Sequence, residues 1–221
     1  AGGKGHRGAD MKTTKKDAEK FADGLKYSGA GLVPVAVCDS LSNQLLMLAY
    51  ANREAVVRTL TSGQAYFFSR SRNELWRKGE TSGNTMKVSA VNADCDSDAL
   101  QYLVEVEGDG KACHTGKRSC FGEGPFSLYD LERLVERRKR KAPEGSYTAK
   151  LLKDSGLCAI KIIEEAKEVA EAFVEKHGKE RVSEEAADVI YHLLALLASD
   201  GITLRDVERV LEKRNSQNKR R

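Results

Sequence analysis

The chain has 221 residues, of which 40% are apolar and 32% charged, and its formal net charge is +4. This composition is typical of a globular protein and excludes a disordered chain, and no apolar run approaches the ~18 residues of a membrane span. The charge is modest and gathers in residues 137–141 and 213–221. We interpret these clusters as solvated helix ends and expect no nucleic-acid or membrane partner.

The N-terminal residues are set aside from the fold. Residues 1–10 are rich in Gly, Lys, His and Arg and precede the first methionine, Met11. We interpret them as a cloning remnant or the stump of a processed leader, and treat residues 1–24 as an N-terminal extension.

Short strands and turns fill the next hundred residues. We expect strands at 32–37, 44–50, 65–68, 86–91 and 99–106, where apolar runs alternate or are bounded by turn residues. One helix interrupts them, with Asn52 as its N-cap and its end near residue 60. The first domain, residues 25–123, is therefore predicted to be a β-rich α+β domain.

Helical periods begin after the Gly/Pro segment 122–125 and continue to the end of the chain. Ser127 with Asp130 indicates a capping box at the start of the first helix. Further helices are expected at 147–153, 158–176, 183–199 and 203–214. We place the boundary near residue 125 and predict an all-α helical bundle for residues 124–221.

Hard and soft metal ligands gather at the end of the first domain. Three aspartates surround one cysteine, and a second segment carries two cysteines and a histidine: Asp94, Cys95, Asp96 and Asp98, then Cys113, His114 and Cys120. Three thiolates leave zinc an open position for water, and carboxylates suit magnesium. Because no CxxC pair is present, another interpretation stays open, in which small buried cysteines lie beside a hairpin and the aspartates are turn residues. The odd number of cysteines, five, argues against a secreted disulfide framework.

Residues 68–84 place cations, hydroxyls and glycines around the only tryptophan, Trp76. Such a loop binds phosphate through arginine and backbone N–H groups, while Trp76 stacks on a base. The alternative is a solvated basic loop with Trp76 in the core.

Together these segments resemble phosphoribosyl-AMP cyclohydrolase of histidine biosynthesis over roughly residues 25–121. The resemblance rests on residues 69–72, 75–84, 94–98 and 113–116, with Cys120. It implies a cyclohydrolase-like fold and zinc-assisted hydrolysis of the adenine ring between N1 and C6.

The resemblance also implies roles for single residues. It implies an obligate homodimer in which Cys95 of one subunit joins Cys113 and Cys120 of the other around zinc. Magnesium goes to Asp94, Asp96 and Asp98, and His114 is the catalytic proton carrier. The substrate contacts that it implies are Arg70, Ser71, Arg72, Trp76, Lys78, Thr81, Ser82, Asn84 and Thr115.

The helical half carries a second acidic group. Its members lie at i, i+3 or i+4 spacing on two consecutive helices: Glu164, Glu165 and Glu168, then Glu185 and Asp188. Carboxylates that face one another repel unless cations neutralise them, and Mg²⁺ bound to a diphosphate does so. A solvated acidic face with salt bridges to neighbouring lysines is the alternative.

Glu164, Glu165 and Glu168 with Glu185 and Asp188 match the EExxE and ExxD motifs of phosphoribosyl-ATP pyrophosphohydrolase, a MazG-like all-α family that this half resembles. The resemblance implies release of pyrophosphate from phosphoribosyl-ATP, with all five acidic residues as magnesium ligands and Glu165 and Glu168 as catalytic residues. It leaves open which of Glu164 and Glu165 binds metal. Lys150 and Lys153 are candidate phosphate contacts.

Two other classes of protein remain as alternatives: a zinc-binding interaction module and a general nucleotide pyrophosphatase. Cys38 and Cys158 are interpreted as packing residues and His192 as a core histidine. The expected location is the cytoplasm, or a plastid if the source is a plant.

Overall fold

The computed structural model describes residues 6–7, 13–108 and 110–218. The chain divides into two compact units, residues 1–125 and 126–221. Most of the N-terminal remnant expected at residues 1–10 lies outside the described residues. No single helix in the described ranges is long and apolar enough to cross a membrane; one pair, residues 179–199 and 204–217, meets that test only when taken together, and it is bent by 105°.

The first unit is built on a five-stranded sheet with the order β1-β6-β7-β2-β3. Its strands are β1 (His6–Arg7), β2 (Val33–Asp39), β3 (Leu45–Ala51), β6 (Met86–Ala93) and β7 (Leu100–Val106). β2 and β7 run parallel and the other neighbours run antiparallel. A separate hairpin pairs β4 (Tyr66–Ser69) with β5 (Glu74–Arg77).

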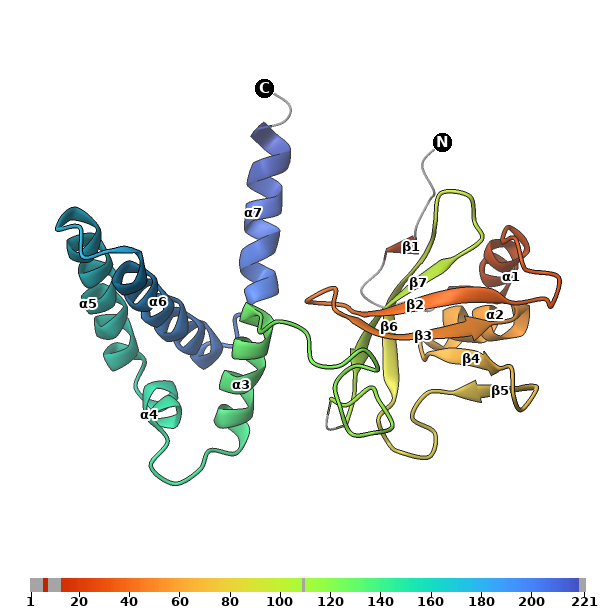
Figure 1. Ribbon diagram of the computed structural model, residues 1–221, viewed down its shortest axis with the longest axis horizontal. Coiled ribbons are helices and arrows are strands. Elements are labelled where there is room, and N and C mark those ends of the chain that lie inside the picture. Colours follow the sequence, from red (N-terminus) through yellow and green to blue (C-terminus); the bar gives the residue numbers. More distant parts are fainter. Residues whose placement is uncertain (1–5, 8–12, 109, 219–221) are drawn as a thin grey trace. The chain divides into compact units, whose positions relative to one another are not determined.

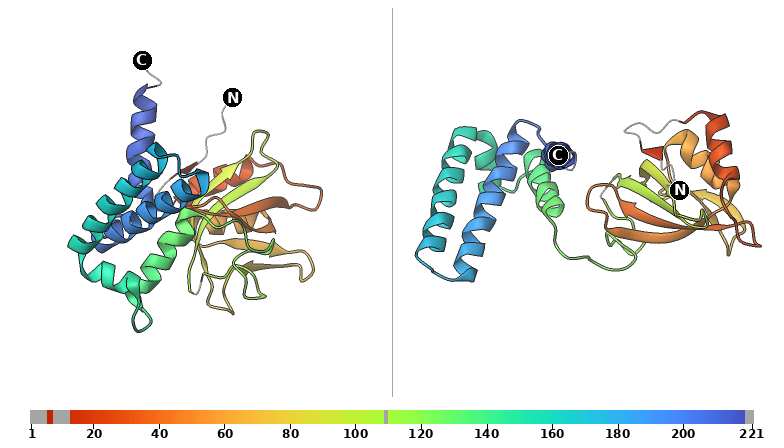
Figure 2. Two further views of the ribbon diagram at one scale, coloured as in Figure 1. Left: turned by 60° about the vertical axis from the view of Figure 1, so that its left-hand side comes forward. Right: turned by 90° about the horizontal axis from the view of Figure 1, so that it is seen from above.

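Two helices, α1 (Lys15–Asp23) and α2 (Arg53–Ser62), lie together on one side of this sheet (Figures 1 and 2). The expected N-cap of α2 is confirmed, because Asn52 accepts a hydrogen bond from the N–H of Ala55 at 2.8 Å. α1 was not expected, and it falls inside the extension 1–24. Its Ala18 and Ala22 are fully buried in the core of the unit, and β1 pairs with β6, so residues 1–24 contribute both a strand and a helix to the fold.

The five strands expected from the sequence are confirmed within two residues at each end, with the largest differences at the ends of β2 and β6. β1 and β5 are additions, and β5 corrects the interpretation of residues 68–84 as one loop. Its register pairs Phe67 with Trp76. The two rings lie 5.2 Å apart between centroids, which favours the interpretation of Trp76 as a packing residue, because its ring is half-buried against the core.

The second unit consists of helices and connecting segments in its described part, which confirms the expected class. It contains α3 (Leu128–Arg140), α4 (Tyr147–Lys153), α5 (Ser155–Val174), α6 (Lys179–Ser199) and α7 (Leu204–Asn218). α5 and α6 form a long antiparallel pair, and α7 extends away from it (Figure 1). The predicted capping box of Ser127 and Asp130 is present at the start of α3.

Two of these helices begin earlier than expected. α5 begins three residues before Cys158, because Asp154 caps it by accepting a hydrogen bond from the N–H of Leu157 at 2.9 Å. α6 begins four residues before Ser183, directly after Gly178, whose φ of 95° reverses the chain. Both extensions lengthen the α5–α6 pair that positions the acidic residues.

The buried core of the second unit is small. Its core cluster of buried residues consists of Val135, Leu151, Cys158, Ala195 and Ala198. Large apolar side chains on the same helices are exposed, among them Ile160, Ile163, Leu193, Val210 and Leu211. Much of the apolar surface of this unit is therefore not covered within the described chain.

Candidate active sites

The aspartate run forms a tight turn between β6 and β7. Oδ1 of Asp94 accepts hydrogen bonds from the N–H groups of Asp98 and Ala99 at 3.0 and 3.1 Å, and these bonds, led by that of Ala99, lower the pKa of Asp94. Ser97 has a φ of 66°, in the left-handed region. Asp94 therefore stabilises the turn, as expected from the alternative in which the aspartates are turn residues.

This turn also brings the three carboxylates together. Ligand oxygens of Asp94, Asp96 and Asp98 all lie within 4.8 Å of one another, and all three residues are exposed. The negative charge of Asp96 is the largest cause of a raised pKa at Asp98. Such crowding favours the binding of a cation, which relieves the repulsion.

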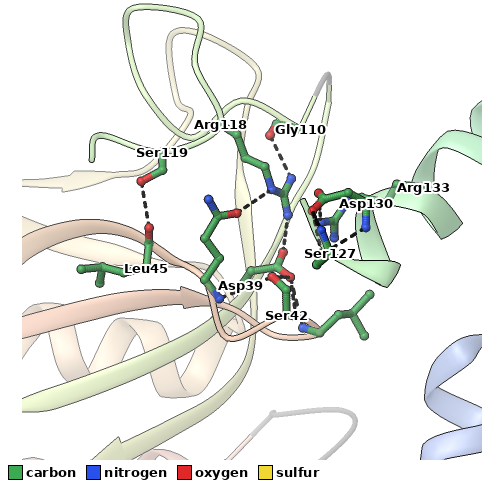
Figure 3. A network of polar contacts seen from close by, with 11 residues as sticks. Asp39, Ser42, Leu45, Gly110, Arg118, Ser119, Ser127, Asp130 and Arg133 are labelled. Atoms are coloured by element: carbon green, nitrogen blue, oxygen red, sulfur yellow. Dashed lines mark hydrogen bonds and ion pairs between the residues drawn. The ribbon is translucent and has the colours of Figure 1, made fainter. Parts of the chain in front are cut away.

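Cys113 and Cys120 lie on one loop after β7. Its backbone closes through bonds from Ala112 to Arg118 and from Cys113 to Lys117, and the N–H of Cys120 donates to the carbonyl of Leu46 in β3. The hydroxyl of Ser119 donates to Leu45 at 2.8 Å (Figure 3). The loop is thus fixed to the start of β3.

The two thiols of this loop differ in their surroundings. A hydrogen bond with the hydroxyl of Thr115, at 3.1 Å, is the main cause of a lowered pKa at Cys113. Burial raises the pKa of Cys120, and contact with Cys113 adds to this. The charge of Lys78 acts on both thiols and favours their ionised forms. Nδ1 of His114 lies 3.9 Å from Sγ of Cys113.

Cys95 does not join this pair within the described chain. It is exposed in the aspartate turn, and its Sγ lies 3.9 Å from Oδ1 of Asp96. Among the described side chains, no group of three ligand atoms within 4.8 Å of one another contains a cysteine. A three-thiolate site therefore cannot form in one chain with this geometry.

The substrate residues expected at 70–84 lie on the hairpin and on the loop that follows it. The guanidinium of Arg70 stacks on the ring of Tyr50 at 3.9 Å, while Arg72 forms an ion pair with Glu74 at 3.0 Å. Ser71 lies at the exposed hairpin turn, with its hydroxyl 3.4 Å from that of Ser69. Arg70 is therefore engaged by a residue of β3, and Arg72 by a residue of the hairpin itself.

The loop after β5 folds tightly over itself. Gly79 has a φ of 81°, and a Cβ at this position would lie 2.3 Å from the backbone of Asn84, so only glycine fits. Thr81 and Ser82 are exposed, and Ser82 accepts a hydrogen bond from the N–H of Asn84. Arg72 and residues 74–82, which include Trp76 and Lys78, line an open pocket of about 350 Å³. This pocket is wide enough for part of a nucleotide.

The helical unit gathers its own carboxylates between α5 and α6. Ligand oxygens of Glu165, Glu185 and Asp188 lie within 4.8 Å of one another. Glu185 is 3% exposed, and burial is the main cause of its raised pKa. The other two expected ligands lie outside this group, since Glu164 pairs with Lys161 at 2.5 Å and Glu168 lies 3.5 Å from Arg181.

Arg181 was not expected in this site. It lies one turn before Glu185 on α6, forms an ion pair with that buried carboxylate, and also reaches Glu168 and Glu184. Oε1 of Glu185 is in contact with the guanidinium but outside hydrogen-bond geometry. The i, i+4 spacing of arginine and glutamate was the available sequence signal.

His192 is buried, as expected for a core histidine. Its Nδ1 lies 2.8 Å from the carbonyl of Asp188, and a carbonyl only accepts, so this nitrogen donates; Nε2 lies 3.1 Å from the hydroxyl of Tyr147. Cys38 and Cys158 are buried packing residues, as expected. The candidate phosphate contacts Lys150 and Lys153 are exposed on α4.

Comparison with known proteins assigns both units. The family model of phosphoribosyl-AMP cyclohydrolase matches residues 47–122, and that of phosphoribosyl-ATP pyrophosphohydrolase matches residues 128–215. The chain is 47% identical to the histidine biosynthesis bifunctional protein HisIE of Thermotoga maritima, over 83% of this chain and 98% of that protein. It is 44% identical to HisIE of Bacillus subtilis, over 90% and 98%. It is also 43% identical to the histidine biosynthesis trifunctional protein of Saccharomyces cerevisiae, over 86% of this chain and 23% of that protein.

The fold and the family matches define a hydrolase with a cyclohydrolase unit followed by a pyrophosphohydrolase unit. The cyclohydrolase family consists of enzymes that are generally metal-dependent. The chain belongs to the family of bifunctional histidine-biosynthesis enzymes, with a cyclohydrolase domain followed by a pyrophosphohydrolase domain. This confirms the resemblance seen in the sequence and favours the enzyme over the interaction module.

Proposed function

We propose that the helical unit releases pyrophosphate from phosphoribosyl-ATP and that the β-rich unit then opens the adenine ring of phosphoribosyl-AMP between N1 and C6. The observation that carries this proposal is the coincidence of each family match with one compact unit that gathers its own metal-ligand side chains. We take residues 25–123 and 124–221 as the two domains. Since the bacterial relatives are biosynthetic proteins, the proposed location is the cytoplasm, or a plastid in a plant.

In the β-rich unit, Cys113 and Cys120 of one subunit and Cys95 of a second would hold zinc. The thiol pair on one loop and the separate exposure of Cys95 support this arrangement. When bound, zinc supplies a water of lowered pKa for hydrolysis at neutral pH. Asp94, Asp96 and Asp98 would hold magnesium, which the mutual repulsion of their carboxylates supports.

The residues around this site would bind and orient the nucleotide. His114, next to a thiol ligand, would carry the proton, because imidazole exchanges protons near neutral pH. The pocket beside Trp76 takes part of the substrate. The remaining contacts proposed are Arg70, Ser71, Arg72, Lys78, Thr81, Ser82, Asn84 and Thr115.

In the helical unit, Glu165, Glu185 and Asp188 would hold magnesium. The buried carboxylate of Glu185, which already faces the guanidinium of Arg181, supports a cation at this place. Glu164 and Glu168 flank the group, and Glu168 with Glu165 would assist the attacking water. Lys150 and Lys153 would contact the phosphates.

The proposed active form is a homodimer. Besides the separated thiols, the exposed apolar side chains of the helical unit support it: Ile163 on α5 is 71% exposed and Leu211 on α7 is 55% exposed. Single exposed apolar residues are ordinary, but several on helices with a small core indicate a surface that a second copy covers. Sedimentation of the purified chain tests this directly.

The two-site proposal is tested by metal analysis and both activity assays on Cys113→Ala and Glu168→Ala. We expect Cys113→Ala to abolish ring opening and to spare pyrophosphate release, and Glu168→Ala to do the reverse. Loss of both activities in a folded single variant would contradict two separate sites. Hydrolysis of ordinary nucleoside triphosphates as fast as phosphoribosyl-ATP would instead indicate a general pyrophosphatase.

A further inference from the structure

The loop that carries the thiols of Cys113 and Cys120 has little apolar packing of its own. Every side chain from residue 113 to 118 is exposed or half-buried. The buried anchors are Ala112 and Ser119, each 1% exposed, which flank this segment. The placement of the two thiols therefore depends on polar contacts between the loop and the rest of the unit.

Three such contacts between described residues come from Arg118 (Figure 3). Its Nη2 donates to Oδ2 of Asp39 at 2.6 Å, its Nε donates to Oε1 of Gln44 at 3.3 Å, and its Nη1 donates to the carbonyl of Gly110 at 3.4 Å. Asp39 ends β2 and Gln44 directly precedes β3. The guanidinium thus ties the thiol loop to the turn between these strands, and its rigid fork of donors suits this task.

Asp39 is fixed from its other side. Its Oδ1 accepts hydrogen bonds from the N–H groups of Leu41 and Ser42, at 3.3 and 2.9 Å, and from the hydroxyl of Ser42 at 2.8 Å. The residue is 4% exposed. Because the ion pair with Arg118 is largely shielded from water, its loss costs more than the loss of a surface pair.

We propose that Asp39 and Arg118 are positioning residues that hold Cys113 and Cys120 in place for zinc. The inference rests on the proposed zinc site and concerns residues that touch neither metal nor substrate. Groups that orient metal ligands contribute strongly to affinity, and their loss typically weakens metal binding by ~10–100-fold. A loop that is ordered beforehand also loses less conformational freedom when the metal binds.

The test is the zinc affinity of full-length Asp39→Asn, measured by competition with a chromophoric chelator, together with the thermal midpoint of the same sample. The substitution keeps the size of the side chain but removes the charge that faces Arg118. We expect zinc binding weaker by about 10–100-fold at temperatures where the chain stays folded. Arg118→Lys keeps the charge without the fork, and we expect an intermediate loss.

The control for the chemical change itself is Asp23→Asn. Asp23 forms a bidentate pair with Arg53 in the same unit, at 2.6 and 3.1 Å, so this variant makes the same substitution in an arginine–aspartate pair that is exposed and lies away from the thiol loop. We expect wild-type zinc affinity. An equal loss of affinity in the control would mean that the effect reflects general stability and would overturn the inference.

Gln44→Ala is a milder variant, because it leaves the bonds of Asp39 intact, and it keeps the inference testable if Asp39→Asn does not fold. We expect a smaller drop in zinc affinity with an unchanged midpoint. Wild-type affinity in Gln44→Ala and Arg118→Lys would overturn the positioning role. A wild-type chain that takes up no zinc would overturn the proposed zinc site itself, so the two failures are distinguishable.

Discussion

A mixing experiment tests whether the zinc ligands come from two chains. Cys95→Ala and Cys113→Ala chains are each expected to be inactive in ring opening when alone. If Cys95 serves the site on the partner subunit, a heterodimer of the two variants contains one site with all three thiols and one site that lacks two of them. Co-assembly of two inactive chains should therefore restore activity.

The size of the recovery follows from counting the sites. Random assembly from equal amounts gives about one half heterodimers, each with one intact site of two, so ring opening should return to about a quarter of the wild-type rate. The assay is absorbance at saturating phosphoribosyl-AMP with zinc added, after the chains are mixed under mildly dissociating conditions or co-expressed. Pyrophosphate release by the helical unit, which both variants retain, measures the amount of folded enzyme.

The matched control pairs Cys113→Ala with Cys120→Ala. Both thiols lie on one loop, so every site in such a heterodimer lacks a ligand, and no activity should return. Recovery in this control, or none in the Cys95→Ala mixture despite demonstrated heterodimers, would refute the shared site. The second outcome would require Cys95 to approach the loop of its own chain, against the geometry of the single chain.

Three further predictions concern both units. Arg181→Ala should bind Mn²⁺ more tightly by roughly 2–5-fold, measured by calorimetry without substrate, because the exposed guanidinium competes with the cation for the carboxylates. The control is Lys167→Ala, whose pair with Glu171 lies outside the cluster and which should bind Mn²⁺ as the wild type does. Tighter binding in this control would refute the competition. The charge of Asp96 raises the pKa of Asp98, so the metal-free fold loses stability as pH rises from the ordinary carboxyl pKa through the raised one. Asp98→Asn should therefore raise the thermal midpoint of the metal-free protein by a few degrees at most at neutral pH. An equal gain in strong acid, where Asp98 is protonated, would contradict this explanation. Leu151 is fully buried, so Leu151→Ala should lower the unfolding free energy of the helical unit by about 2–5 kcal/mol, seen as early thermal loss of pyrophosphate release while ring opening persists.

Local signals in the sequence were sufficient for most of the fold. Asn52 and Ser127 are N-caps whose side chains accept hydrogen bonds from N–H groups of the next few residues, and Asp130 accepts in turn from the N–H of Ser127. Their effect is local and can be predicted from the sequence. The helix of residues 15–23 carries the same kind of cap at Thr14. It was missed because its apolar face consists largely of alanines, which give a weak periodic signal.

Contacts between segments distant in the chain could not be predicted from such local signals. Strand β5 forms because it pairs with β4. Two of its four residues are charged, so its sequence alone suggested a loop. Arg118 looked like one cation in a basic turn, and only the fold brings it to Asp39, 79 residues earlier in the chain. Such a pair follows from sheet order, which a single sequence does not contain.

The separation of the thiols is an instructive case, because a prediction already made implied it. Strand β7, expected at residues 99–106, lies between the turn of Cys95 and the loop of Cys113. Seven strand residues at ~3.3 Å each span roughly 20 Å, so the two motifs lie toward opposite ends of β7. β7 runs parallel to β2, so the two strands end at the same edge of the sheet. The thiol loop bonds to Asp39 at the end of β2 and to Leu46 at the start of β3. These bonds keep the loop at the C-terminal end of β7, away from the turn that carries Cys95. The length of one strand thus supports the proposal that Cys95 shares a metal with the thiol loop of a second subunit.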